Sequence, residues 1–195
     1  MNLDNKIYNK TSVCHFSKAQ EQWGEFGNMT GGFPFRITRN ELIPSTENLY
    51  QAMRFTEHPE IQKKIISEKS GFFAKLIAKK YRKTHTRADF EDTKLDIMEW
   101  CLKLKLANHK RFGEALILTG SRDIVEESHK DTWWGTTLKD NTFTGINVLG
   151  QLLMELREQY RQNLADNTRE YKLVVPPNIN DFNFLGCAVQ TIDKR

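Results

Sequence analysis

The sequence predicts a single-domain α+β protein that is mainly helical and contains only a few short strands. At 195 residues, the chain is long enough to bury one hydrophobic core without disulfides or metals. Between residues 45 and 160, apolar side chains recur three or four positions apart, which is the period of an amphipathic helix. Runs that suit a strand are brief and lie at residues 35–38, 123–127 and 171–175.

Helices are expected at residues 45–55, 58–83, 89–108, 111–118 and 147–160, the second broken near Gly71. Pro59 suits a helix start, Asp89 can cap the third helix, and Gly120 suits the position after the fourth. Residues 1–22 are polar and irregular, with at most a short helix at 17–21, and residues 181–184 are expected to form a peripheral flap.

Composition indicates a soluble globular protein with a weak preference for anionic partners. Lys and Arg outnumber Asp and Glu by 29 to 25, for a net charge of +4 and a pI near 8.9. The three cysteines are far apart, which favours a reducing compartment and argues against a cysteine-based zinc site. No apolar run approaches about 18 residues, and residues 1–6 lack a signal-peptide pattern. These features predict a cytoplasmic protein with no membrane contact.

Glu47 is the first candidate catalytic residue. It follows Ser45 and Thr46, either of which can cap the helix, and it shares a helical face with Gln51 four residues later. Unpaired backbone N–H groups and the helix dipole favour a carboxylate there, so we expect Glu47 to be ionised. Acids are also common in first turns because they stabilise the helix, and this simpler role remains open.

A basic stretch runs from Lys63 to Arg87. Between Glu60 and Arg87 the chain carries nine Lys or Arg side chains, opposed only by Glu60 and Glu68. Such a face is suited to contact the phosphates of a nucleic acid. An ordinary solvated helix surface explains it equally well.

Two glycine-containing aromatic segments are candidate ligand-binding loops. One spans residues 23–35, and the other contains Trp133, Trp134 and Gly135. Adjacent tryptophans in a polar loop either fill the core or form a stacking wall for a base. Common phosphate-loop, dinucleotide, zinc-protease and serine-hydrolase motifs are absent, and the five histidines are too scattered to suggest a metal set.

Six separated segments, in order, resemble the NADAR (YbiA-like) family. They are residues 26–28 (F-S-N in the family), 45–55 (S-x-E-H-x-[FY]-Q-A-x-K-F), 87–98 (R-x-D-W-x-x-x-K-x-x-x-M), 112–120 (K-F-x-x-x-x-x-L-L-x-T-G), 131–135 (D-x-x-W-G) and 147–150 (N-x-L-G). Asn48, Gly27, Phe90 and Thr136 depart from the family pattern, but the glutamate is kept. The resemblance implies a YbiA-like domain at residues 23–162, with extensions at 1–22 and 163–195, the latter packed on the domain.

The resemblance implies an N-glycosidase that needs neither a metal nor another cofactor. The most favoured substrate is ADP-ribosylated guanine in DNA, whose cleavage would reverse a toxin's modification, with the Lys63 to Arg87 stretch contacting the nucleic acid. Ribosylaminouracil phosphates of riboflavin biosynthesis are the alternative, and a non-catalytic module that binds ADP-ribose or another nucleotide is a third.

By position, the resemblance makes Glu47 the catalytic residue and places Asp131 in the substrate pocket. Asp131 is also a candidate for a second catalytic carboxylate, and a turn role before the tryptophans is the equally open alternative. The remaining expected substrate-binding residues are Asn28, Gln51, Arg87, Lys94, Trp133, Trp134, Gly135 and Asn147. Cleavage of a bond to ribose builds positive charge on the sugar, which an anionic Glu47 beside the ring would stabilise. Arg87 and Lys94 would hold a diphosphate, although Arg87 can equally pair with Asp89.

Overall fold

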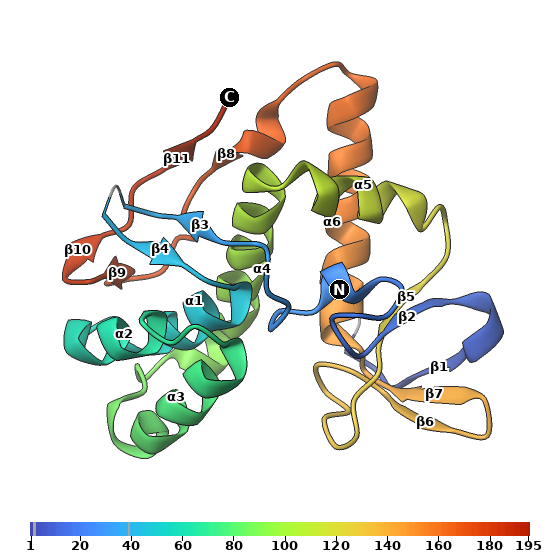
Figure 1. Ribbon diagram of the computed structural model, residues 1–195, viewed down its shortest axis with the longest axis horizontal. Coiled ribbons are helices and arrows are strands. Elements are labelled where there is room, and N and C mark those ends of the chain that lie inside the picture. The colour runs from blue at the N-terminus through green and yellow to red at the C-terminus, as the bar shows by residue number, and fades with distance from the viewer. Residues whose placement is uncertain (2, 39) are drawn as a thin grey trace. The chain divides into compact units, whose positions relative to one another are not determined.

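The computed structural model describes residues 1, 3–38 and 40–195, and it confirms a mainly helical α+β fold with short strands (Figure 1). The chain forms two compact units. The N-terminal unit comprises Met1–Gly27 and Lys110–Thr168, and the C-terminal unit comprises Asn28–His109 and Arg169–Arg195. Each unit therefore combines two separate segments, and neither is a continuous piece of chain.

Four helices form the body of the C-terminal unit, and α1 contacts the other three. They are α1 (Thr46–Ala52), α2 (Pro59–Ile66), α3 (Gly71–His85) and α4 (Phe90–Asn108). A single 3₁₀ turn, Met53–Phe55, extends α1. Every residue of α1 is buried, so whatever its polar side chains bond to lies inside the unit.

Short strand pairs complete the C-terminal unit. Their bounds are β3 (Phe35–Arg36) with β4 (Leu42–Ile43), β8 (Leu173–Val174) with β11 (Ile192–Asp193), and β9 (Asn183–Phe184) with β10 (Cys187–Ala188), all antiparallel. The strands predicted at 35–38 and 171–175 are thus present but shorter, and the 3₁₀ turn Glu170–Lys172 takes part of the second.

The prediction of a peripheral flap at residues 181–184 was wrong. Phe182 is buried and meets the ring of Trp100 edge-on at 5.0 Å between centroids. Gln62, which has no exposed surface, donates to the Asn183 carbonyl (3.0 Å) and accepts from the Leu185 N–H (2.6 Å). The segment belongs to the core because two aromatic rings and a buried amide secure it, and these partners are more than 80 residues away in sequence.

The N-terminal unit combines two helices with small sheets. Its helices are α5 (Lys110–Leu118) and α6 (Val148–Ala165). The strand β7 (Thr142–Gly145) lies between β1 (Lys6–Asn9) and β6 (Thr137–Lys139), and β2 (Cys14–Phe16) runs parallel to β5 (Ile124–Glu126). The predicted strand at 123–127 and the two predicted helices are confirmed.

Residues 1–22 were wrongly predicted to be irregular, with at most a helix at 17–21. They contain β1 and β2, and residues 18–21 form bends and a turn in place of a helix. Tyr8 is the only buried residue of β1, so the sequence of this strand shows no alternation of apolar and polar residues. Its partner β7 lies some 135 residues away, and the pairing is therefore set by tertiary structure.

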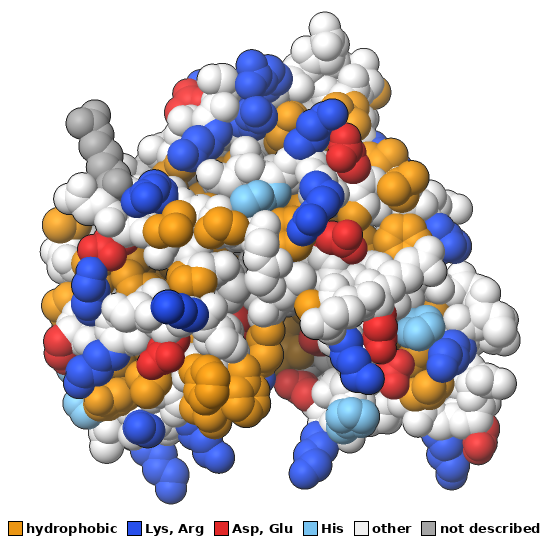
Figure 2. Space-filling model, viewed as in Figure 1, with side chains coloured by type: hydrophobic (Ala, Val, Ile, Leu, Met, Phe, Trp, Pro, Cys, Tyr) orange, Lys and Arg blue, Asp and Glu red, His pale blue; other side chains and the backbone are white. Residues whose placement is uncertain are grey.

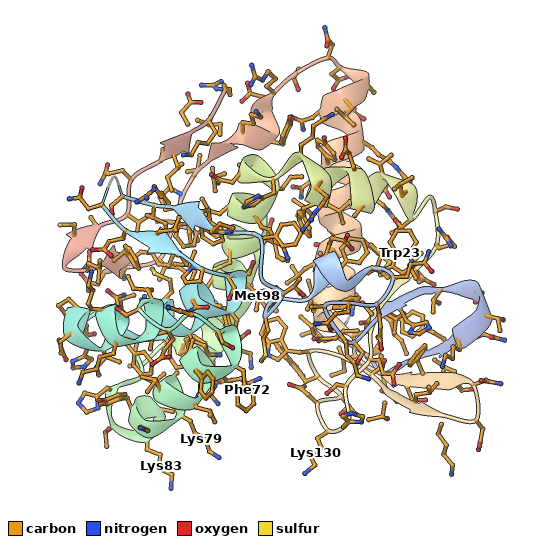
Figure 3. The ribbon with its side chains drawn as sticks, in the orientation of Figure 1. Trp23, Phe72, Lys79, Lys83, Met98 and Lys130 are labelled. Atoms are coloured by element: carbon orange, nitrogen blue, oxygen red, sulfur yellow. The ribbon has the colours of Figure 1, made fainter. Side chains whose placement is uncertain are left out.

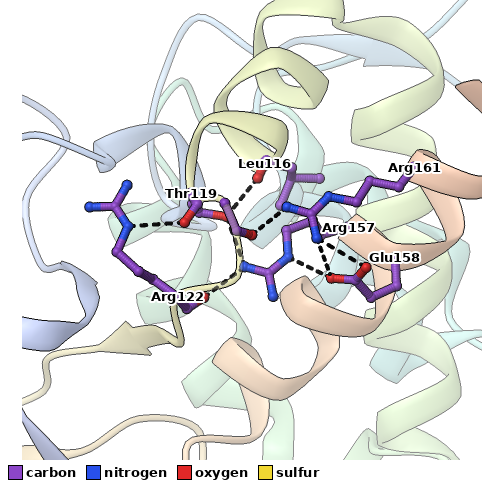
Figure 4. A network of polar contacts seen from close by, with 7 residues as sticks. Leu116, Thr119, Arg122, Arg157, Glu158 and Arg161 are labelled. Carbon is purple, nitrogen blue, oxygen red and sulfur yellow. Dashed lines mark hydrogen bonds and ion pairs between the residues drawn. The ribbon is translucent and has the colours of Figure 1, made fainter.

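A buried arginine ties α5 to α6 in the N-terminal unit (Figure 4). Arg157 on α6 donates to Thr119 Oγ1 (2.9 Å) and to the Arg122 carbonyl (2.7 Å). It also pairs with Glu158, which Arg161 contacts in turn (3.0 Å). Gly120, with φ of +63°, ends the helix as predicted, and Arg161 donates to its carbonyl.

Candidate active site

Glu47 lies in the first turn of α1, and the local sequence explains why the helix begins there. Ser45 is the N-cap, with its hydroxyl oxygen accepting from the Asn48 N–H (3.3 Å). The Glu47 N–H donates to the Asn28 carbonyl (2.9 Å), which joins two segments that the resemblance had brought together. Gly71, the first residue of α3, packs so closely that an added Cβ would lie 3.0 Å from Glu47 Cβ. The Glu47 side chain is only 5% exposed.

A chain of two hydrogen bonds leads from the carboxylate to an arginine. Gln51 Nε2 donates to Glu47 Oε1 (2.9 Å), and Arg82 Nη2 donates to Gln51 Oε1 (3.1 Å). The arginine fixes which end of the amide is oxygen, so the amide nitrogen must face Glu47. The shared helical face of Glu47 and Gln51 is confirmed, and its consequence is a carboxylate held in one orientation.

Burial, rather than the helix start, dominates the protonation of Glu47. Removal from water raises its pKa above the ordinary value of 4.5. Lys75, the Gln51 hydrogen bond and then Arg82 and Arg54 act in the opposite direction without cancelling this effect. The expectation that the helix end would lower the pKa of Glu47 is therefore not met, because burial of the carboxyl group outweighs the effects of the nearby donors and cations.

Two arginines near Glu47 were not singled out from the sequence. The Arg54 guanidinium lies 3.6 Å from the centroid of the Phe90 ring, and burial together with Arg82 lowers the pKa of Arg54 to about 10. The Nε atoms of Arg54 and Arg82, and Oδ1 of Asn28, are buried and have no hydrogen-bond partner among the described residues. Buried donors and acceptors are rarely left unpaired in proteins, so we expect water or a polar ligand to satisfy these three atoms.

The sequence offers only a partial signal for these arginines. Arg54 follows Glu47 by seven residues, two helical turns, and could have been placed on the same face. Arg82 lies 35 residues from Glu47 and was counted only within the basic stretch. Its approach depends on how α3 packs against α1, which no local pattern reveals.

Arg87 and Lys94, predicted to hold a diphosphate, are both engaged within the protein. Arg87 is buried and donates to Asp89 Oδ2 (3.0 Å), Thr56 Oγ1 (3.3 Å) and the Asn180 carbonyl (2.7 Å). Lys94 contacts Glu91 at 2.5 Å. The structural alternative for Arg87, pairing with Asp89, is thus what forms, and Asp89 consequently makes no side-chain cap on α4.

In the N-terminal unit, Asp131 organises the turn before the tryptophans. Its Oδ1 accepts from the backbone N–H of Trp133 (3.1 Å) and Trp134 (2.9 Å), and its own N–H donates to Ser128 Oγ (3.0 Å). The Asp131 side chain is exposed. This is the turn role that the sequence left open as the alternative to catalysis.

Trp133 and Trp134 do not fill the core of the unit. Both are half-buried, and their rings meet edge-on with centroids 4.7 Å apart. Their carbonyl groups accept from the N–H groups of Val148 (3.1 Å) and Leu149 (2.9 Å) at the start of α6. The start of α6 therefore holds the tryptophan loop by its backbone.

Asn147 and Gly135, predicted to bind substrate, have structural roles here. Asn147 has no exposed surface, and its amide bonds to the Ile124 carbonyl (2.9 Å), the Tyr8 hydroxyl (3.3 Å) and the Glu126 N–H (3.1 Å). Gly135 is buried, and an added Cβ would meet the Glu126 carbonyl oxygen at 2.9 Å. Contact between Asn147 and a substrate would require these internal bonds to break.

The predicted site residues are divided between the two units. Asn28, Glu47, Gln51, Arg87 and Lys94 belong to the C-terminal unit, and Asp131, Trp133, Trp134, Gly135 and Asn147 belong to the N-terminal unit. Within the C-terminal unit, Glu47, Gln51 and Asn28 come together, joined by Arg82. Among the described residues, no three His, Cys, Asp or Glu side chains gather as a metal site, and no helix is long and apolar enough to cross a membrane.

Comparison with known proteins gives a consistent set of relatives. "Riboflavin biosynthesis protein VVA0006" of Vibrio vulnificus is 27% identical over 184 residues, which cover 93% of this chain. The chain spans only 48% of that protein's length. "N-glycosidase YbiA" of Escherichia coli is 27% identical over 76% of this chain and 88% of its own length.

A solved structure and a family profile agree with these relatives. The NMR structure of E. coli YbiA matches with a TM-score of 0.68 at 26% identity, covering 80% of this chain and 88% of YbiA. The profile of the NADAR domain matches residues 14–161, which include every predicted site residue. This chain belongs to the NADAR family.

Proposed function

We propose that the protein is an N-glycosidase that hydrolyses the bond between a base and ribose, with Glu47 as the catalytic carboxylate. The observation that carries the proposal is the buried Glu47, bonded to Gln51 and surrounded by the positive charges of Lys75, Arg82 and Arg54. The names of the relatives, N-glycosidases among them, support the same class of reaction.

Glu47 would act as an anion next to the sugar. As the bond from the anomeric carbon to the base nitrogen lengthens, positive charge develops on the ribose ring. A carboxylate fixed at that carbon stabilises this charge and can take a proton from the attacking water. Gln51 holds Glu47 Oε1 in place, so little reorganisation is needed when the charge appears. Water supplies the hydroxyl group of the sugar product, and the base leaves with a proton.

Neighbouring groups of the C-terminal unit would bind the rest of the nucleotide. The unpaired Nε donors of Arg54 and Arg82 suit phosphate oxygens, and the free Oδ1 of Asn28 suits a ribose hydroxyl. We assign the phosphate role to these arginines rather than to Arg87, because the donors of Arg87 already serve Asp89, Thr56 and Asn180.

Trp133 and Trp134 belong to the N-terminal unit, and their stacking on a base stays a prediction. Asp131 would hold the loop that carries them. Its part as a second catalytic carboxylate stays a prediction.

As substrate we favour ADP-ribosylated guanine in DNA, so that the reaction reverses a modification made by a toxin. The support is charge: residues 69–88 contain seven Lys or Arg and no Asp or Glu. Ribosylaminouracil phosphates are the second candidate, favoured by the riboflavin biosynthesis proteins among the relatives. A cytoplasmic location fits either one, since none of the three cysteines forms a disulfide.

Incubation with each substrate class separates the candidates. Release of ADP-ribose from an oligonucleotide carrying ADP-ribosylated guanine supports the first. Cleavage of ribosylaminouracil phosphate alone selects the second. Binding of ADP-ribose without cleavage of either substrate would identify a non-catalytic module and overturn the proposal.

A further inference from the structure

The outer face of α3 carries aromatic and basic side chains that nothing in the C-terminal unit covers. Phe72 is 56% exposed, Phe73 is 55% exposed and Leu76 is 42% exposed. Scattered apolar side chains are normal on a surface, but three neighbours that include two phenylalanines form a patch of the kind that marks an interaction site.

Lysines continue this face along the helix. Phe72, Leu76, Lys79 and Lys83 follow one another at intervals of four, three and four residues, so they form one row on α3. Lys75 and Lys80 flank the row, and all four lysines are exposed. Figure 3 shows Phe72, Lys79 and Lys83 projecting from α3 along the same edge of the unit, and Figure 2 shows apolar and basic side chains gathered there.

The same helix also adjoins Glu47. Gly71, Ala74 and Ala78 form the buried face of α3, and Gly71 packs directly against Glu47. Phe72 is the next residue in the chain. The outer face of α3 therefore begins one residue after the glycine that packs against the candidate catalytic carboxylate.

We propose that this face, defined by Phe72, Phe73, Leu76, Lys79 and Lys83, binds single-stranded nucleic acid next to the nucleotide being cleaved. Phe72 and Phe73 stack on unpaired bases, and the lysines contact backbone phosphates. The proposal deepens the proposed function by making the substrate an unpaired strand, and it rests on that function only for the role of Glu47.

Two features favour single-stranded nucleic acid as the ligand of this face. The row combines exposed rings with cations, and single-stranded nucleic acid offers both free base faces and phosphates. In a duplex the bases are already stacked on one another and offer no face to a phenylalanine. The phenylalanine rings meet edge-on with centroids 5.6 Å apart, so they present two differently inclined faces to successive bases.

Binding of unmodified oligonucleotides tests the proposal without any cleavage. The probes are fluorescent oligo-dT and oligo-rU of about 12 nucleotides, measured by anisotropy with the full chain. The double variant Phe72→Ala/Phe73→Ala is expected to weaken binding by at least about 30-fold, because two stacked bases lose their partners. Leu118→Ala, which removes a similarly exposed apolar side chain from α5, is the control and should leave binding unchanged.

The lysines are tested through salt dependence. Lys79→Gln/Lys83→Gln should reduce the slope of log Kd against log salt by about 1.4, since each phosphate contact with a single strand contributes about 0.7. Lys103→Gln/Lys110→Gln makes the same change in net charge away from α3 and should leave the slope nearly unchanged. The probe that shows the larger phenylalanine effect identifies DNA or RNA as the natural strand.

Two results would overturn the proposal: oligonucleotide binding that does not depend on Phe72 and Phe73, or phenylalanine-dependent binding only to vesicles containing phosphatidylserine. Because the substitutions are at exposed positions, an unchanged melting temperature shows that the variants are folded. Phenylalanine-dependent binding by a protein that cleaves no substrate would leave this inference standing while the glycosidase proposal fails.

Discussion

The Gln51 side chain donates to Glu47 Oε1 at 2.9 Å, and Arg82 in turn donates to the Gln51 side chain at 3.1 Å. The Gln51 amide therefore lies between the Glu47 carboxylate and the Arg82 guanidinium and bonds to both. It stabilises the ionised carboxylate through a hydrogen bond and transmits the orientation imposed by Arg82. Three of the following predictions concern this arrangement.

Glu47→Gln should abolish most of the glycosidase activity while keeping the fold. The substitution preserves shape but removes the negative charge and the base, a loss that typically costs about 10²- to 10⁴-fold in rate. The measurement is kcat with the cleaved substrate. Glu91→Gln, at an exposed carboxylate paired with Lys94, is the matched control and should remain active. Full activity in Glu47→Gln would refute the scheme.

The pH profile of kcat should report the environment of Glu47. If the anion is the active form, activity rises with pH through the pKa of Glu47, which burial places above 4.5. Gln51→Leu removes a hydrogen bond that lowers this pKa, so the acidic limb should move to higher pH by about one unit or more, since a hydrogen bond to a charged group contributes about 1.5–3 kcal/mol. Arg82→Gln removes the positive guanidinium group and should move the acidic limb in the same direction.

Shifts of the pH profile would not follow if Gln51 and Arg82 had only a structural role. Gln62→Leu serves as the comparison, because this buried amide contacts the end of α1 without bonding to Glu47. It should lower stability without moving the acidic limb. Equal pH profiles for Gln51→Leu and the wild type would contradict the assignment.

Glu47→Gln should also raise thermal stability at neutral pH. Because the pKa of Glu47 is higher in the folded than in the unfolded chain, the folded state binds the proton more tightly. Stability is thus lost as pH rises from 4.5 through the folded pKa, and the neutral glutamine avoids that loss. For a chain of this size each kcal/mol changes Tm by about 2–4 °C.

Melting curves of the two proteins at several pH values check this. The difference in Tm should grow as the pH rises through the folded pKa of Glu47 and should vanish as the pH approaches 4.5. A wild type more stable than Glu47→Gln at pH 8 would show that the surrounding cations, rather than burial, control the carboxylate.

Asp131 can be tested by keeping its turn role and removing its charge. Asp131→Asn retains the oxygen that accepts from the Trp133 and Trp134 N–H groups, so we expect nearly normal stability and activity. Asp131→Ala removes that oxygen and should cost about 1 kcal/mol, as lost caps do. Loss of activity in Asp131→Asn without loss of stability would instead make Asp131 the second catalytic carboxylate.

Arg87 should matter for stability more than for substrate affinity. Arg87→Met leaves the Asn180 carbonyl and Thr56 without their charged donor and should lower the free energy of unfolding by about 2–4 kcal/mol. Urea denaturation measures this, and KM should change little in material that is folded. A large rise in KM at unchanged stability would instead support the predicted contact between Arg87 and the substrate.

Where the signal is local, the sequence was sufficient. The Ser45 cap and the apolar stripe after it predicted α1, Pro59 predicted the start of α2, and Gly120 predicted the end of α5. The pairing of Asn28 with the Glu47 turn was not deducible from periodicity, but the family resemblance brought both segments together.

The sequence did not predict the contacts in which a side chain has several possible partners or a partner far away in the chain. Asp89 was free to cap α4 or to bind Arg87, and only the buried position of Arg87 decides between them. Arg54 and Arg82 approach Glu47 through the packing of α1 against α3. The same applies to Phe182, whose partner Trp100 lies on α4.

The division of each unit into two chain segments has a consequence for synthesis on the ribosome. The N-terminal unit is complete once residue 168 has emerged, whereas the C-terminal unit still lacks residues 169–195. Gln62 bonds both to the Ala52 carbonyl at the end of α1 and to Asn183 and Leu185. Gln62, which contacts the helix that carries Glu47, thus acquires two of its partners late in synthesis. A prematurely terminated chain would contain every candidate catalytic residue without these bonds.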